Sequence, residues 1–281
     1  MPELAYVNGV YGPLAQAKVS IEDRGFQFGD SVYEVIVAHG GSPFLLDRHL
    51  ERLRAGLAGI ELELDFAAHP IERIVHEGLR RSELPEALIY LQITRGAAPR
   101  SHVVPANLTP TIVMTVKPLI PVPDELRRRG ARVMTTTDLR WANCYIKATT
   151  LLPNVLAKNQ AVRRGYDDAI FVAPSGEVRE CTASNLFVIE GGALRIPPRN
   201  QSILHGVTQG FLMELAGAIG LGVREETIRL DALRAADEVL LSGTASEVLA
   251  ITSIDDHPVA DGKVGPITHR LYEEFIRRTR G

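Results

Sequence analysis

The spacing of hydrophobic residues in the first third of the chain predicts short strands alternating with helices. Apolar, β-branched runs indicate strands, and the glycines and proline of residues 40–43 predict a hairpin turn after which residues 44–46 resume a strand. Leucines recur at the helical period over residues 50–57, behind Asp47 as the expected N-cap, so this helix should bury one stripe. The elements expected here are strands at 4–7, 32–38, 87–94 and 111–116, and helices at 47–60 and 70–81.

A proline-rich segment divides the chain. Residues 117–123 contain three prolines, which cannot continue a strand or a helix, so we expect a linker at 118–123 between an N-terminal α/β domain (1–117) and a C-terminal domain (124–281). The elements expected beyond the linker are strands at 131–137, 169–173, 185–189 and 238–241, and helices at 154–164, at 206–220 and over the last residues. This order indicates an α+β protein of two lobes, between which ligands commonly bind.

Composition narrows the functional classes but names none. The 281 residues include 31 basic and 34 acidic ones, and the net charge of −3 provides no basic surface field for nucleic acid or anionic membranes. Cys144 and Cys181 lie far apart and indicate a reducing compartment rather than a disulfide framework. We expect a cytoplasmic protein, because the N-terminus resembles no leader and no apolar run reaches the roughly 20 residues of a membrane span.

Lysine is scarce, so each lysine stands out. Only five of the 31 basic residues are lysines, which a bias in genome composition explains. Lys147 lies in the segment Cys-Tyr-Ile-Lys-Ala-Thr-Thr-Leu-Leu, with no acidic residue beside it. Such a lysine lies either at an exposed strand edge or in a desolvated site, where a lowered pKa makes the amine a Schiff-base nucleophile.

Four further segments could carry chemistry, and each also has an ordinary structural explanation. Glu180 precedes small hydroxyl and amide residues in a predicted turn, where it could simply be solvated. A helix opens at Gly206 and could bind an anion, or Gly206 could only cap it. Arg100 and His102 share a Pro/Gly loop and could hold a carboxylate together, or could be solvated loop residues. Tyr33 could face a pocket or the core.

Taken together and in this order, these segments resemble the fold-type IV pyridoxal-phosphate enzymes. The resemblance covers nearly the whole chain and is strongest in residues 146–158 and 180–185. It implies a two-domain fold with pyridoxal 5'-phosphate at the domain interface and no metal. Lys147 would then be the Schiff-base lysine that also moves the substrate proton. The other cofactor contacts implied are Glu180 at the pyridine nitrogen, Leu204 against the ring, and Arg52, Val207, Thr208 and Thr244 at the phosphate.

Within that family, Arg100, His102 and Tyr33 look like the substrate-carboxylate site of D-amino-acid aminotransferases. In that subgroup the arginine loop comes from the neighbouring subunit, so the resemblance implies a homodimer. It also implies ping-pong transfer from a D-amino acid, such as D-alanine or D-glutamate, to a 2-oxo acid such as pyruvate or 2-oxoglutarate. Two departures, Tyr145 and Ala183, stand where relatives often have aspartate and serine. The alternatives are a 4-amino-4-deoxychorismate lyase and an (R)-amine transaminase.

Overall fold

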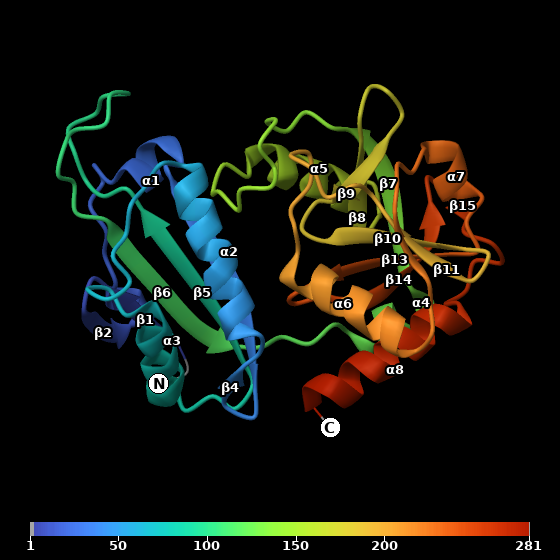
Figure 1. Ribbon diagram of the computed structural model, residues 1–281, viewed down its shortest axis with the longest axis horizontal. Helices are drawn as coiled ribbons and strands as arrows, with labels where there is room; N and C mark the ends of the chain where they lie inside the picture. Colours follow the sequence, from blue (N-terminus) through green and yellow to red (C-terminus); the bar gives the residue numbers. More distant parts are fainter. Residues whose placement is uncertain (1–2, 281) are drawn as a thin grey trace. The chain divides into compact units, whose positions relative to one another are not determined.

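The computed structural model describes residues 3–280 and divides them into two units (Figure 1). Unit 1 is Met1–Ile120 with Ile146–Thr150, and unit 2 is Pro121–Tyr145 with Leu151–Gly281. The predicted C-terminal domain therefore needs a correction, because it included Lys147. The segment around Lys147 groups with unit 1 because Ile146 and Ala148 are buried in that unit's core. The predicted α+β class is confirmed, since each unit combines one sheet with helices.

The sheet of unit 1 is antiparallel, with strand order β2-β1-β6-β5-β3-β4. Its strands are β1 (Leu4–Val7), β2 (Val10–Pro13), β3 (Ser31–His39), β4 (Ser42–Pro43), β5 (Ala87–Thr94) and β6 (Thr111–Pro118). The helices of the unit are η1 (Leu14–Gln16), α1 (Arg24–Phe28), α2 (Leu46–Gly59) and α3 (Ile71–Ser82). Helices α2 and α3 pack on the sheet, and the core lies between them and β3, β5 and β6.

Helix α2 begins differently from the prediction. Residues 44–46 do not form a strand, because Leu45 takes a left-handed conformation (φ 53°) as the N-cap and the helix starts at Leu46. Asp47 therefore lies in the first turn, where a negative charge still suits the helix dipole. The predicted leucine stripe is confirmed: Leu50, Leu53 and Leu57 are all buried. His49 and Arg52 each precede one of these leucines, and both side chains contact Glu34 of β3.

Unit 2 contains a nine-stranded mixed sheet in which β14–β7, β7–β8 and β11–β12 are parallel. Its strands are β7 (Ala131–Thr137), β8 (Asp168–Val172), β9 (Val178–Cys181), β10 (Asn185–Glu190), β11 (Ala193–Ile196), β12 (Val223–Glu225), β13 (Glu238–Gly243), β14 (Glu247–Ile254) and β15 (His257–Pro258). Its helices are α4 (Asp124–Arg129), α5 (Leu152–Arg163), α6 (Val207–Ala218), α7 (Leu230–Arg234) and α8 (Pro266–Arg280).

The strand β10 shows how this sheet is covered on both faces. Leu186 and Val188 point into one core cluster, whereas Phe187 and Ile189 point into a second cluster formed with α6 and α8. A continuous apolar run is typical of a strand buried on both sides. Helix α5 packs on β7 and β8 through Ala157 and Ala161. Among residues 3–280, no helix is long and apolar enough to cross a membrane.

The prediction for Glu180 is wrong at the level of local structure. Glu180 does not lie in a turn but in the short strand β9, which pairs with β8. The turn begins only after Cys181, whose N–H donates to the Ser184 carbonyl at 2.8 Å and so brings β9 back to the start of β10. Glu180 is thereby fixed in a strand rather than solvated, and it is 5% exposed.

Candidate active site

The segment of Lys147 is anchored to the first residues of β3. The Tyr33 N–H donates to the Lys147 carbonyl at 3.0 Å, and the Ser31 and Thr149 hydroxyls lie 2.5 Å apart. The half-buried Lys147 side chain lies with its Nζ 4.3 Å from the centre of the Tyr33 ring. An aromatic face attracts an ammonium group and covers one side of it. Lys147 and Tyr33, two of the predicted site residues, are therefore neighbours.

Next to Tyr33 in this strand, a buried carboxylate holds Arg52. Glu34 is 0% exposed and accepts two hydrogen bonds from Arg52, at 2.8 and 2.7 Å, and one from His49 Nδ1 at 2.7 Å. Burial raises the pKa of Glu34, but the Arg52 charge and the hydrogen bonds from Arg52 and His49 outweigh it and lower the pKa to about 2. Glu34 is therefore ionised and fixes the planar guanidinium of Arg52 from one edge.

His49 completes this group as a neutral ring. Burial lowers the pKa of His49, an effect that the Arg52 and Lys147 charges strengthen and Glu34 only partly offsets. A neutral ring that donates from Nδ1 satisfies the second oxygen of Glu34 without adding a charge. The prediction from sequence named Arg52 but missed Glu34 and His49, although Glu34 directly follows Tyr33 in the strand and His49 lies three residues before Arg52 on the helix.

Arg100 and His102 lie on one loop of unit 1, residues 95–110, called here the Arg100 loop. Both residues are exposed, and both contact the ring of Phe28: the Arg100 guanidinium carbon lies 4.8 Å from the ring centre and the His102 ring meets it edge-on at 5.5 Å. The structure thus brings the two predicted carboxylate-binding side chains together. Tyr33, the third member of that predicted group, lies instead beside Lys147.

In unit 2, Glu180 lies in a dense network of donors. Its Oε1 accepts a hydrogen bond from Arg140 at 2.5 Å, while Oε2 accepts one from the Asn185 amide and one from the Leu204 backbone N–H, each at 3.1 Å. Arg140 is also paired with Asp138 at 2.9 Å, and it lies over the Phe171 ring at 4.3 Å. Arg140 was not predicted from the sequence. It lies 40 positions from Glu180, and only the fold brings the two side chains together.

The start of α6 carries the other predicted residues of unit 2. Val207 and Thr208 are buried in its first turn, and the N-cap Gly206 supplies no side-chain hydrogen bond. A Cβ at Gly206 would lie 2.0 Å from Asn185 Oδ1, so a larger residue would have to displace the amide that donates to Glu180. The first N–H groups of a helix have no partner within it, so they are available to an anion. Thr244 is half-buried in the turn between β13 and β14.

These groups fit pyridoxal phosphate chemically. A lysine amine suits its aldehyde, a buried ionic carboxylate suits a protonated ring nitrogen, and an arginine with a helix N-terminus suits a phosphate dianion. Lys147 and Arg52 belong to unit 1, whereas Glu180, Leu204, Val207, Thr208 and Thr244 belong to unit 2. Across residues 3–280, no group of three or more His, Cys, Asp or Glu side chains could hold a metal ion.

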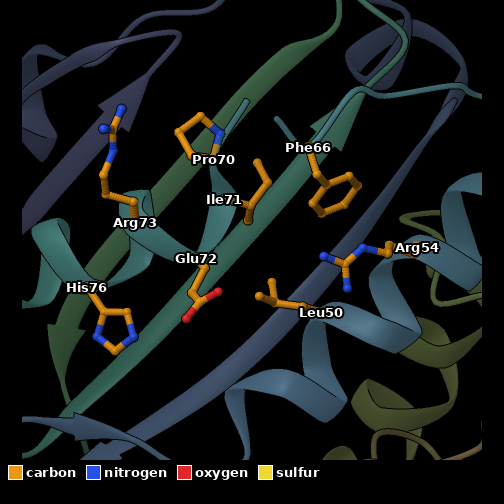
Figure 2. A pocket seen from close by; sticks show the side chains of 8 residues that line it. All are labelled: Leu50, Arg54, Phe66, Pro70, Ile71, Glu72, Arg73 and His76. Carbon is orange, nitrogen blue, oxygen red and sulfur yellow. The ribbon is translucent and has the colours of Figure 1, made fainter. Parts of the chain in front are cut away.

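A separate hollow of about 420 Å³ lies between α2 and the start of α3 (Figure 2). Arg54 and Leu50 line it from α2, and Glu72, Arg73 and His76 line it from α3, together with Phe66, Pro70 and Ile71. None of the predicted site residues lines this hollow, and Arg54 lies over the Phe66 ring at 4.4 Å. We therefore assign it no part in the site.

Comparison with known proteins identifies the family. The family model of amino-transferase class IV matches residues 31–254. The D-alanine aminotransferase of Staphylococcus haemolyticus is 37% identical over 271 residues, covering 96% of this chain and 95% of that protein. The Escherichia coli branched-chain amino acid aminotransferase aligns with a TM-score of 0.93 at 26% identity, covering 100% of this chain and 95% of that one.

A second solved structure contains a form of the cofactor. This branched-chain amino acid aminotransferase, solved with pyridoxamine 5'-phosphate, aligns with a TM-score of 0.91 at 27% identity, covering 98% of this chain and 93% of that one. Fold, family model and overall sequence identity agree. The chain belongs to the class IV aminotransferases and is a pyridoxal-phosphate-dependent aminotransferase of fold type IV.

Proposed function

We propose that this aminotransferase acts on D-amino acids, such as D-alanine or D-glutamate, and passes the amino group to a 2-oxo acid such as pyruvate or 2-oxoglutarate. The observation that carries the proposal is the pairing of Arg100 and His102 on one loop, in contact with the same Phe28 ring. The relative named D-alanine aminotransferase supports it, at 37% identity over nearly the whole chain. The branched-chain aminotransferases share the fold at 26–27% identity, which leaves substrate choice to local residues.

Each predicted residue has a distinct task in this proposal. Bound pyridoxal phosphate supplies the electron sink that makes the substrate's α-proton removable. Lys147 would hold the cofactor through Nζ, and its amine would also carry the proton that leaves the substrate carbon. Tyr33 covers one side of that amine and so limits its directions of approach. The two half-reactions use one site in turn, so we expect ping-pong kinetics.

Two buried carboxylates have a role in this proposal. Glu180 would pair with the protonated ring nitrogen of the cofactor, and Arg140, Asn185 and the Leu204 N–H hold its carboxylate in place. Leu204 would lie against the ring. In unit 1, Glu34 orients Arg52, whose charge would bind the phosphate. In unit 2, the N–H groups of Val207 and Thr208 and the hydroxyls of Thr208 and Thr244 would be phosphate donors.

Substitution of Arg100 tests the substrate class. Arg100→Ala should lower kcat/KM for D-alanine by roughly 10²-fold, because a bidentate contact to the carboxylate is lost, and should leave turnover of a chiral (R)-amine without a carboxylate nearly unchanged. Lys147→Ala should abolish both reactions. Lys263→Ala, at an exposed lysine, should alter neither. The assay measures the pyruvate formed from D-alanine, with 2-oxoglutarate as the amino acceptor.

Other outcomes favour other members of the family. An enzyme that converts L-leucine but not D-alanine would refute the proposal. Equal losses of amine and amino-acid turnover in Arg100→Ala would also refute it. Release of pyruvate from 4-amino-4-deoxychorismate without an amino acceptor would indicate the lyase. Turnover of (R)-amines alone would indicate the amine transaminase.

The proposal includes a homodimer. Large apolar side chains are exposed near the Arg100 loop, among them Ile21 and Val103 (each 78% exposed) and Phe26 (73%). On α5 of unit 2, Leu152, Val155 and Leu156 are exposed on neighbouring turns. Exposed apolar clusters of this kind are typical of protein interfaces. Sedimentation should give twice the chain mass of 30.7 kDa. A monomer that turns over D-alanine at full rate would contradict this part of the proposal.

A further inference from the structure

The base of the Arg100 loop is joined to the segment before α1 by backbone contacts. The Arg24 N–H donates to the Gly96 carbonyl at 2.9 Å, and the Ala98 N–H donates to the Glu22 carbonyl at 3.2 Å. Asp23 and Ala97 form an isolated antiparallel bridge between these contacts. The loop is therefore fixed at residues 96–98, whereas the tip with Arg100 and His102 extends beyond this pairing.

One buried arginine reaches the tip. Arg24 is 5% exposed, and its Nη1 donates to the Ser101 carbonyl at 2.6 Å while Nη2 lies 3.5 Å from the His102 carbonyl. Its Nε donates to Asp30 at 2.8 Å, which supplies the counter-charge that a buried guanidinium needs. Arg24 thus holds the backbone of the residue between Arg100 and His102.

The Phe28 ring holds the side chains of the same tip. The guanidinium carbons of Arg24 and Arg100 lie 4.9 and 4.8 Å from its centre, and the His102 ring meets it edge-on. Phe28 is the last residue of α1, whose first residue is Arg24. Backbone and side chains of the tip are therefore held by the two ends of one short helix.

From this geometry we propose that Arg24 and Phe28 are positioning residues that set substrate specificity by fixing where Arg100 and His102 point. The proposal rests on the proposed function, because it gives Arg100 and His102 the task of binding the substrate's α-carboxylate. Arg24 and Phe28 act through those two residues. This holds whether the loop contributes to the site of its own subunit or to that of the neighbouring subunit. If Phe28 and Arg24 no longer held the tip of the loop, Arg100 would still carry its charge. Its guanidinium would, however, lose the fixed direction that a bidentate contact to a carboxylate requires.

The structure provides a matched control for Arg24. Arg95 also pairs with Asp30, at 2.9 Å, but its remaining donors reach the carbonyls of Ile60 and Glu61 rather than the loop tip. Arg24→Met and Arg95→Met therefore both remove one partner of the same carboxylate. Only Arg24→Met removes the donors to Ser101 and His102.

The first measurement needs no catalysis. Cleavage of the Arg100–Ser101 bond by trypsin should be at least about ten-fold faster in Arg24→Met than in the wild type, because the Ser101 carbonyl loses its anchor and the bond can enter the protease. In Arg95→Met cleavage at this bond should match the wild type. Equal cleavage rates in Arg24→Met and the wild type would overturn the proposal.

The second measurement separates specificity from stability. In Arg24→Met the KM for D-alanine should rise about ten-fold or more, with a smaller change in kcat and with (R)-amine turnover retained. Phe28→Leu keeps the apolar character and should shift the KM for D-alanine in the same direction, which keeps the proposal testable if Arg24→Met does not fold. Parallel losses for D-alanine and the amine would indicate a structural role and overturn the inference.

The two proposals fail in different ways. If Arg100→Ala leaves the KM for D-alanine unchanged while Arg24→Met still releases the loop, the proposed carboxylate site is wrong. If Arg100→Ala raises that KM but Arg24→Met and Phe28→Leu do not, the carboxylate site stands and the positioning role is wrong.

Discussion

At the scale of residues, each unit has a buried carboxylate that pairs with an arginine beside predicted site residues. Glu34 pairs with Arg52 in unit 1, and Glu180 pairs with Arg140 in unit 2. An unpaired buried charge is strongly unfavourable, so each arginine supplies a counter-charge to its carboxylate and also sets its orientation. Burial lowers the pKa of Arg140, but its bonds to Asp138 and the nearby charge of Glu180 outweigh this and raise the pKa above the usual range. Arg140 therefore stays charged.

His49 is expected to make the stability of the protein depend on pH. Because burial lowers the pKa of His49, the folded protein keeps the ring neutral while the unfolded chain binds a proton below about pH 6.5. The free energy of unfolding should therefore fall as the pH drops from about 7 to about 5, by at most roughly 1.4 kcal/mol per pH unit from this one group. Urea denaturation at each pH measures the slope.

The control for this prediction keeps the hydrogen bond but not the titration. His49→Asn retains an N–H donor for Glu34 and should give a shallower slope over the same pH range; an unchanged slope would argue against the prediction.

Glu34 affects stability at lower pH. Its pKa falls from the usual 4.5 to about 2 in the folded protein, so its contribution is present above about pH 4.5 and is lost as the pH falls towards 2.

At the scale of elements, long periodic segments were predictable, whereas short ones were predicted in some cases, such as β1 (Leu4–Val7), and missed in others. The strands at 87–94 and 131–137 and the buried leucine stripe of α2 match their predictions, because alternation and the 3.6-residue period are local properties. The four-residue strand β9 was missed, since Val-Arg-Glu-Cys carries too short a pattern, and its assignment depends on pairing with β8. The position of Glu180 in a strand was therefore decided by tertiary contacts.

The Arg100 loop depends on a glycine at its base. Gly96 has φ +105°, and a Cβ there would lie 2.1 Å from the Thr109 carbonyl oxygen. Gly40 also has a positive φ, +56°, but a Cβ there would meet nothing within 4 Å. Gly40→Ala should cost about 1–2 kcal/mol through the left-handed backbone alone. Gly96→Ala should cost at least about 2 kcal/mol more, because backbone must also shift.

Thermal and urea unfolding of the two glycine variants provide the comparison. The unfolding free energies should separate clearly. Under the proposed function, Gly96→Ala should in addition weaken binding of D-amino acids, since it displaces the loop that carries Arg100. Similar unfolding free energies for the two variants would show that the loop tolerates the shift.

At the scale of the whole molecule, the chain passes from unit 1 to unit 2, returns for five residues and leaves again. The returning segment, Ile146–Thr150, carries Lys147. Ile146 is 5% exposed within the core of unit 1, and the closely packed Gly59 leaves no room beside it, since a Cβ there would lie 2.9 Å from Ile146 Cδ1. Lys147 is therefore held by the packing of its neighbour Ile146.

Truncation of Ile146 is expected to loosen this segment. Ile146→Ala should lower the free energy of unfolding by about 2–4 kcal/mol, because it leaves a cavity in a packed core. The matched control is Ile120→Ala, since Ile120 is 83% exposed at the end of unit 1 and should change stability by no more than about 0.5 kcal/mol. Urea denaturation of both variants measures the difference. A small loss in Ile146→Ala would show that the segment is held by its backbone bonds instead.

The amino-acid sequence by itself determined the α+β class, most of the long elements and the family, because periodicity and motif spacing are local along the chain. It also singled out Lys147, Glu180 and Arg100 as candidates, whose roles stay predictions. The tertiary structure decided the rest: the pairing of Glu34 with Arg52, the contact of Arg140 with Glu180, and the hydrogen bond from Arg24 to Ser101 of the Arg100 loop. These partners lie between 18 and 77 positions apart. No local pattern connects such residues, since only the pairing of strands and the packing of helices bring their side chains within hydrogen-bond distance.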